Sequence, residues 1–461
     1  MLWLTACNND YRMKREQLNG QATEDKKAAP KDSTTLHPTI TVYIENSGSM
    51  AGYVNGSTLF KDALRELLVL LKYQYDERNI RVCFINSAIY PSTIPCKLED
   101  LASNLNVNTI AVGNTGSSNL NEVFRLVLSK TSKSSISILL SDCIYSIDGA
   151  NSEELLEEAK TLTKGVFLSK SKENFQLTTT LVKMNSSFTG EYWTRANQPV
   201  MLSEQLRPYY ICIIGEDQVM EDFNSRIVFD AESLQGYEDK CILTSKDYSA
   251  GNYFSVLTST YATGRFKPIK RLTSSTAVRG IEDAEPNQRT NEPFSFAVAV
   301  DLKNMPVGEA YLADASNYEL TEGNFIVDRI EKIDKKTIDA PDWVRIQNSG
   351  ASHLIVLKAK GPAAGTVTVA LKKQLPSWIS ETEPKEGEQE YKPGKTFGFQ
   401  YLVNGIAEAY QTVNPEQKYY LSIRIPIVKS SDSILGKSLV IILLLFSIVA
   451  VFLIVLKNRK R

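Results

Sequence analysis

Residues whose side chains could hold a metal ion gather in a short loop near position 45. Residues 40–44 form a short apolar run rich in β-branched side chains, which is typical of a buried strand. Glu45, Ser47 and Ser49 follow this run directly. Carboxylate and hydroxyl oxygens suit Mg²⁺, Mn²⁺ or Ca²⁺ rather than a soft metal. Because ligands of open α/β sheets bind at the carboxyl ends of the strands, the loop is a candidate metal site.

Two later segments carry further oxygen ligands in equivalent places. Ser118 lies just before a helical pattern that begins near residue 119, and the apolar run 136–141 ends at Asp142. If both runs are strands of one sheet, their carboxyl ends meet at the same edge. We therefore expect the side chains of Ser118 and Asp142 to lie near the loop at 45–49.

The three loops together resemble those of a von Willebrand factor A (vWA) domain. Glu45 to Ser49 resembles the Asp-x-Ser-Gly-Ser loop of its metal-ion-dependent adhesion site, Ser118 stands at the position of the family's threonine, and Asp142 at that of its second aspartate. The resemblance covers roughly residues 38–230. It implies a bound Mg²⁺ (or Mn²⁺ or Ca²⁺), with an acidic residue of a partner protein completing the coordination of that ion.

Glu45 departs from the pattern of the family, which has aspartate there. Its extra methylene group moves the carboxylate outward, so a degenerate, metal-free site is the alternative. A Ser/Gly loop after a strand is also common as a simple turn or helix cap. On that interpretation Ser118 only caps its helix and Asp142 is a solvated loop residue.

The elements that must position these residues alternate along the chain. Helical spacing over 59–75, 119–128 and 152–164 separates apolar runs at 79–85, 136–141, 175–184 and 209–214. This alternation predicts an α/β fold with a doubly wound, mainly parallel sheet, vWA- or Rossmann-like in architecture.

One connection inside this fold is unusually long, and we expect a loop over residues 185–207. Tyr192, Trp193 and Arg195 in this segment are of the types enriched at protein interfaces, and they are candidate partner-binding residues. The alternative is that they cover a sheet edge or pack against a helix.

The rest of the chain divides by composition into further segments. Short alternating runs without a long helix predict an all-β sandwich-like domain. The expected boundaries are a polar tether with a lipobox-like start at 1–37, a vWA-like domain at 38–230, a connecting region at 231–290, the sandwich at 291–430, a transmembrane helix at 436–456 and a basic tail at 457–461.

The two ends of the chain predict attachment to a membrane. Leu439 to Leu456 is apolar except for Ser447, and at ~1.5 Å per residue it spans about 27 Å, close to the hydrocarbon core. The basic residues that follow place this end in the cytoplasm. Residues 4–7 resemble a bacterial lipobox with Cys7 as the lipidated residue. The segment before Cys7 is too short for a signal peptide, so either the start is truncated, which we favour, or the match is chance.

Composition argues against several classes of function. The net charge of −1 indicates no nucleic-acid partner. Only His37 and His353 are present, so neither a histidine-based zinc site nor a Ser-His-Asp triad is supported, and no phosphate loop is found. We expect no enzyme, although a Mg²⁺-dependent hydrolase is the less favoured alternative.

The sequence thus predicts a protein-binding, adhesion-type module in the bacterial inner (plasma) membrane. A single helix would cross the bilayer, with the bulk of the chain in the periplasm and the C-terminus in the cytoplasm. The alternative is a metal-free envelope scaffold that binds through its sandwich and long loops.

Overall fold

The computed structural model describes residues 37–116, 119–145, 152–194, 198–246, 248, 252–290, 292–303, 305–321 and 324–429. Ser118, Arg195, Cys7 and the apolar segment 439–456 lie outside these residues. Within the described part of the chain, no helix has the length and apolar character needed to cross a membrane.

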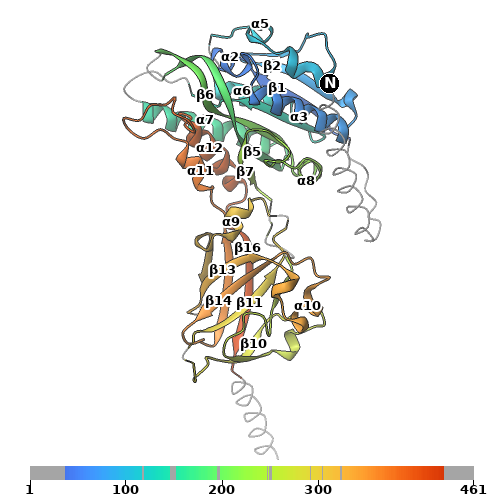
Figure 1. Ribbon diagram of the computed structural model, residues 1–461, viewed down its shortest axis with the longest axis vertical. Helices are drawn as coiled ribbons and strands as arrows, with labels where there is room; N and C mark the ends of the chain where they lie inside the picture. Colours follow the sequence, from blue (N-terminus) through green and yellow to red (C-terminus); the bar gives the residue numbers. More distant parts are fainter. Residues whose placement is uncertain are drawn as a thin grey trace, which may run out of the picture. The chain divides into compact units, whose positions relative to one another are not determined.

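The first part of the chain alternates strands and helices (Figure 1). Its elements are β1 (Thr39–Glu45), α2 (Ala51–Val54), α3 (Leu59–Gln74), β2 (Ile80–Ile85), β3 (Ile89–Pro91), α4 (Leu101–Asn104), α5 (Val107–Ile110), α6 (Leu120–Lys130), β4 (Ser135–Ser141), α7 (Ser152–Ser171), β5 (Leu177–Trp193), β6 (Pro199–Glu216), α8 (Asp217–Arg226) and β7 (Tyr237–Thr244).

The sheet built from these strands is mixed, which corrects the expected mainly parallel arrangement. Its strand order is β3-β2-β1-β4-β6-β5-β7. Only the pairs β1–β2 and β1–β4 are parallel, whereas β6, β5 and β7 pair antiparallel beyond β4. The α/β class is confirmed. The difference arises because β5 and β6 form a hairpin, and the two strands of a hairpin are necessarily antiparallel.

Residues 185–207 are not the long loop that we expected. They extend β5 and β6 into a two-stranded ribbon whose pairing runs from Met184–Tyr209 to Trp193–Pro199. The register shifts between Phe188 and Gly190, where Glu204 adopts a φ of 51°, typical of a β-bulge. Since Ser141 at the end of β4 faces Tyr210, the ribbon runs past the carboxyl end of β4.

Both faces of the sheet are covered by helices, and each covering forms a separate hydrophobic cluster. Alternate residues of β1 and β4 point to each face, as the period of a strand requires. One cluster contains buried side chains of α3 and α8, and the other contains those of α6 and α7. Helix α12 (Phe399–Val413) also contributes Phe399, Leu402 and Ile406 to the second cluster. A helix far along the chain therefore covers the sheet that contains the candidate site.

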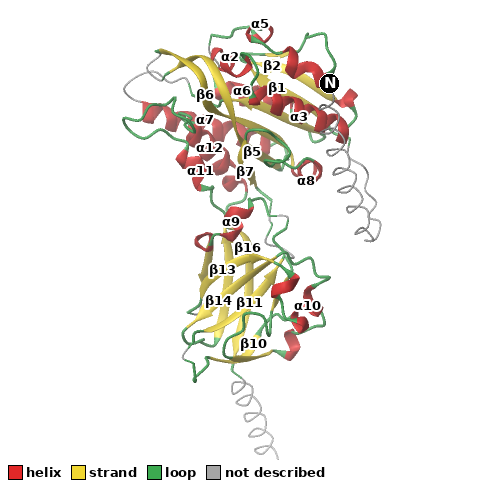
Figure 2. Cartoon of the chain, viewed as in Figure 1, coloured by secondary structure: helices red, strands yellow, loops and turns green. Residues whose placement is uncertain are grey.

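The second part of the chain is built mainly from strands, shown in yellow in Figure 2. Its elements are β8 (Phe254–Val256), β9 (Arg265–Pro268), β10 (Ile281–Glu285), β11 (Phe294–Val300), α9 (Glu309–Ala313), β12 (Tyr318–Thr321), β13 (Ile326–Lys332), α10 (Ala340–Ile346), β14 (His353–Ala359), β15 (Gly365–Lys372), α11 (Ser377–Glu381) and β16 (Tyr419–Val428).

These strands form two sheets with a shared core. The orders are β12-β15-β16-β10-β9 and β13-β14-β11-β8, and side chains from both sheets form one buried cluster. Strands β8, β9 and β10 come from residues that we had assigned to the connecting region 231–290. Helix α12 falls inside the range expected for the sandwich, yet its buried side chains pack with the first sheet.

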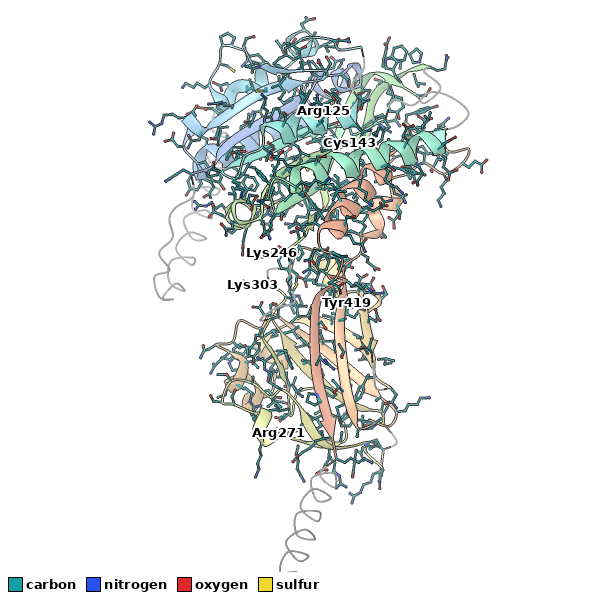
Figure 3. The ribbon with its side chains drawn as sticks, turned by 180° about the vertical axis from the view of Figure 1, so that it is seen from behind. Arg125, Cys143, Lys246, Arg271, Lys303 and Tyr419 are labelled. Carbon is teal, nitrogen blue, oxygen red and sulfur yellow. The ribbon has the colours of Figure 1, made fainter. Side chains whose placement is uncertain are left out.

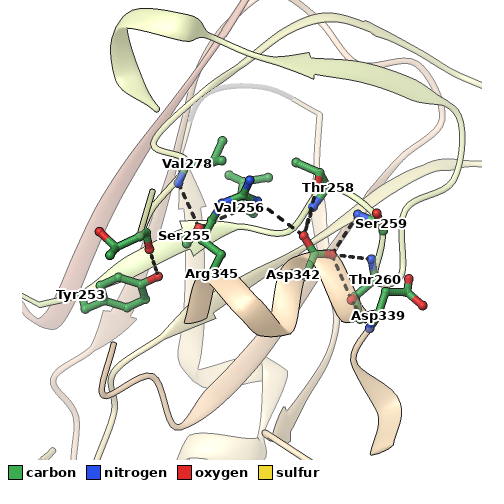
Figure 4. A network of polar contacts seen from close by, with 11 residues as sticks. Tyr253, Ser255, Val256, Thr258, Ser259, Thr260, Val278, Asp339, Asp342 and Arg345 are labelled. Carbon is green, nitrogen blue, oxygen red and sulfur yellow. Dashed lines mark hydrogen bonds and ion pairs between the residues drawn. The ribbon is translucent and has the colours of Figure 1, made fainter. Parts of the chain in front are cut away.

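A buried carboxylate ties helix α10 to the loop that follows β8 (Figure 4). Asp342 is fully buried and accepts hydrogen bonds of 2.8–2.9 Å from the backbone N–H groups of Thr258, Ser259 and Thr260. The hydroxyls of Thr258 and Thr260 donate to it as well. Burial alone would raise the pKa of the Asp342 carboxyl, but these hydrogen bonds outweigh burial and lower it.

We expect Asp342→Asn to destabilise the protein by about 2–3 kcal/mol, because hydrogen bonds to a charged acceptor are lost and donors are left buried. Because the folded-state pKa of Asp342 is depressed, its stabilisation exists above the unfolded-state value of about 3.9 and is lost as the pH falls through the folded-state value. Urea unfolding at several pH values measures both effects.

Asp339→Asn is the matched control, because Asp339 is exposed and its side chain makes no capping hydrogen bond to α10. An equal loss of stability in the two variants would contradict the role assigned to Asp342.

Candidate functional site

The loop after β1 is held rigidly by a buried asparagine. Asn46 is fully buried, and its Nδ2 donates to the carbonyl oxygens of Ile110 (2.7 Å) and Val112 (2.8 Å). Its Oδ1 accepts from Nδ2 of Asn86, which lies just after β2. The backbone N–H of Gly48 donates to the carbonyl of Thr115 at 2.8 Å. These bonds fix the loop across the carboxyl ends of the first two strands.

Glu45 turns its carboxylate back toward its own strand. Its Oε1 accepts from the backbone N–H of Ser47 at 3.0 Å, and its Oε2 lies 3.5 Å from Oγ of Ser141 at the end of β4. Only 1% of the residue is exposed. The longer side chain thus serves the closure of the turn and the junction between β1 and β4.

The two serines and Asp142 lie together, as the sequence predicts. The Oγ atoms of Ser47 and Ser49 are 3.0 Å apart. Asp142 is buried, and its Oδ1 accepts from the backbone N–H of Ile144. Burial raises the pKa of the Asp142 carboxyl, although hydrogen bonds from Ser49 and Ile144 and the charge of Arg207 oppose this rise. The position is marked in Figure 3 by Cys143, the next residue.

A buried arginine brings positive charge to the same edge. Arg207 lies on β6, three residues before Tyr210, the partner of Ser141, and is 1% exposed. Its Nη1 donates to the carbonyl oxygens of Glu390 (3.1 Å) and Lys392 (3.0 Å). Its guanidinium stacks on the ring of Tyr192, with Cζ 4.6 Å from the ring centroid. A cation–π contact of this kind gains strength where water is excluded.

Several polar atoms around Arg207 are buried without a hydrogen-bond partner among the described residues. They are Asp142 Oδ2, Arg207 Nε and Nη2, and the hydroxyl of Tyr192. Burial raises the pKa of the Tyr192 phenol, and the charge of Arg207 opposes that rise. Orphaned polar atoms are uncommon inside proteins, and four of the ten found among the described residues gather here, which makes this group a candidate site.

The segment 382–398 crosses this edge on its way to α12, and we call it the strap. Besides the two carbonyls that bind Arg207, it is held by Gln205, whose Nε2 donates to the carbonyl of Tyr391 at 2.7 Å. The hydroxyl of Tyr210 donates to Oγ1 of Thr396 at 3.0 Å. Contacts along the ribbon and the end of the sheet therefore define the path of the strap.

The strap ends in a turn that requires glycine. Gly398, the N-cap of α12, has a φ of 81°, and a Cβ there would lie 2.6 Å from the ring of Tyr145. Both carboxylate oxygens of Glu383 accept from the backbone N–H of Gly398 at 3.0 Å. Burial raises the pKa of Glu383 to about 7 despite these hydrogen bonds.

The described donors fit a divalent cation poorly. The two serine hydroxyls bond to each other, Glu45 is engaged by its own turn, and only Oδ2 of Asp142 lacks a partner. Arg207 adds a positive charge that interacts with Asp142. Within the described residues, no three acidic, histidine or cysteine side chains are placed to hold a metal ion together.

The structure brings together four of the five predicted metal ligands: Glu45, Ser47, Ser49 and Asp142; the fifth, Ser118, lies outside the described residues. Among the predicted partner-binding residues, Tyr192 is buried in the site, Trp193 is 44% exposed on the ribbon, and Arg195 is not described.

Sequence reasoning missed Arg207 and the strap. A charged residue close before the apolar run 209–214 was the available signal, but it becomes informative only with the register of β6 against β4.

A scan against protein-family models finds no match for this chain, and a search of curated proteins finds none either.

We expect millimolar Mg²⁺ or Mn²⁺ to leave the melting temperature of the full chain unchanged. A working metal site would stabilise the folded state by about 2.7 kcal/mol at a hundredfold excess over Kd, which differential scanning fluorimetry resolves easily. A metal-dependent rise that disappears in Asp142→Ala would show that the donor set does hold an ion.

We expect the stability of the protein to fall as the pH rises through about 7, because ionised Glu383 is disfavoured in its half-buried position. The folded-state pKa of Glu383 lies above its unfolded-state value of about 4.3. Its contribution to stability is therefore complete below about pH 4 and is lost as the pH rises to about 7. Glu383→Gln should flatten the pH dependence of urea unfolding between pH 5 and 8. Retention of the full slope in this variant would assign the dependence to other groups.

Proposed function

We propose that this chain is a membrane-anchored, extracytoplasmic protein-interaction module that binds its partner at the carboxyl edge of a vWA-like sheet. The observation that carries the proposal is the ribbon that extends past this edge. Trp193 and Met201 are 44% and 69% exposed, and the register of β5 and β6 places them on the same face of the ribbon, opposite Tyr192. Exposed aromatic and methionine side chains of this kind are enriched at interfaces.

The buried side of the ribbon supports a rigid presentation of that face. The ring of Tyr53 contacts Phe188 edge-on, and the Tyr53 hydroxyl donates to the carbonyl of Pro208 at 2.5 Å. A Cβ at Gly52 would lie 2.4 Å from the ring of Phe188, so glycine allows α2 to approach the ribbon this closely. A ribbon fixed in this way loses little conformational entropy when it binds a partner.

The proposal favours the metal-free alternative, because the described donors suit a cation poorly. A metal-dependent adhesion site is the second candidate. The 3.0 Å separation of the Ser47 and Ser49 hydroxyls and the orphaned Oδ2 of Asp142 favour it. An enzymatic role has no comparable support at this edge.

Site-specific photo-crosslinking in the producing bacterium tests the proposal. A photoreactive residue at Met201 should give a discrete crosslinked product, and Trp193→Ala should reduce its yield severalfold because it removes the neighbouring contact area. Val344 is the matched control, since it is equally exposed (69%) but lies on α10. Equal crosslinking from Met201 and Val344, or none from Met201, would contradict the placement of the interface.

A further inference from the structure

The guanidinium of Arg207 has one edge that is occupied and one edge that is not. Both hydrogens of Nη1 are directed to strap carbonyls, those of Glu390 and Lys392. Nε and Nη2 have no hydrogen-bond partner among the described residues. These two nitrogens lie side by side on the planar group and form the fork that matches a carboxylate in a bidentate manner.

The neighbouring carboxylates, those of Asp142 and Glu390, do not fill this fork. Asp142 interacts electrostatically with Arg207, yet its Oδ2 lacks a hydrogen-bond partner, as do the two free nitrogens. The hydroxyl of Tyr192, whose ring lies against the guanidinium, is a further buried polar group at the same place, and Arg207 opposes the rise in the pKa of its phenol that burial causes. An arginine side chain stays charged at every physiological pH, so the free fork is a permanent cationic donor pair.

We propose that the Nε and Nη2 edge of Arg207 is a receptor for a carboxylate group, so that this edge of the sheet binds an acidic ligand through a resident guanidinium. The inference rests on the proposed function and names the chemistry of its ligand. The Tyr192 hydroxyl supplies a third donor to the same carboxylate. The free nitrogens have no access to solvent, so a ligand enters when the strap shifts. The strap is held near Arg207 by hydrogen bonds to its backbone carbonyls and by the contact of Tyr391 with the ring of Tyr192.

Asp142 gives the proposal its most discriminating consequence. In a metal site Asp142 is a ligand, and its neutralisation abolishes binding. In a guanidinium receptor Asp142 is a like charge close to the incoming carboxylate, and its neutralisation strengthens binding. Removing the repulsion between Asp142 and the carboxylate of a ligand in the same site changes the affinity for that ligand by at least about tenfold.

The test measures binding to the purified full chain in mild detergent. The probes are sodium acetate, compared with sodium chloride at equal ionic strength, and an amidated peptide with one glutamate, compared with its glutamine counterpart. We expect the carboxylate probes to raise the melting temperature by about 2–4 °C at saturating concentration. Asp142→Asn should lower the Kd by about tenfold or more, and Arg207→Lys, which keeps the charge but loses the fork, should raise it by at least tenfold.

Arg125→Lys is the matched control, because Arg125 is an exposed arginine paired with Glu122 on α6, and it should leave the Kd unchanged. Binding of the peptide but not of acetate identifies a protein side chain as the ligand, and the reverse identifies a small free acid; both support a carboxylate receptor. If Arg207→Lys fails to fold, the response of Asp142→Asn still decides the matter.

Two results would overturn the inference. One is the absence of carboxylate binding in both the wild type and Asp142→Asn. The other is weaker binding in Asp142→Asn, which would make Asp142 a ligand. Crosslinking from Met201 is independent of these outcomes, so its persistence would leave the proposed interface standing while the receptor role of Arg207 fails.

Discussion

The covering of both faces of the mixed sheet is the constraint on which the site depends. Strands β1 and β4 are buried on both sides, with Ile40, Val42 and Ile138 in one cluster and Tyr43 and Leu139 in the other, so each face is covered by helices. On one face α3 and α8 are joined by the short helices α2, α4 and α5. On the other face α6 and α7 leave room that α12 fills, with Phe399, Leu402 and Ile406 in the common cluster. Burying several large apolar side chains stabilises this docking by roughly 1.5–3 kcal/mol for each side chain.

The docking of α12 determines what lies over the candidate site. The chain reaches α12 through the strap, so the strap must cross the carboxyl edge of the sheet. Its carbonyls then meet the guanidinium of Arg207, and Thr396 meets the hydroxyl of Tyr210. The hydrophobic packing of α12 thus sets the polar environment of Arg207 at the carboxyl edge of the sheet.

The charges at this edge are arranged differently from those of a metal-ion-dependent adhesion site. Glu45 accepts a hydrogen bond from the backbone N–H of Ser47 and so closes its own turn. Arg207 introduces positive charge that acts on Asp142, one of the metal ligands that the resemblance implies. A resident guanidinium and a divalent ion would repel each other across a poorly screened interior. This edge therefore favours either a divalent ion or the guanidinium of Arg207, and the described donors favour the guanidinium.

The sequence by itself determined most strands and helices around the site and the gathering of Glu45, Ser47, Ser49 and Asp142 at one edge, because apolar periodicity and the position of polar residues after a strand are local signals. It did not reveal the ribbon at 185–207 or the strands β8, β9 and β10. It did not determine the direction of β5, β6 and β7, since the residue pattern of a strand does not say which neighbour it pairs with or in which direction. Only the tertiary structure placed Arg207 beside Asp142 and brought α12 and its strap back from more than 150 residues downstream of β6. Those arrangements arise from pairing register and from the need to bury a second face, and neither is encoded by neighbouring residues.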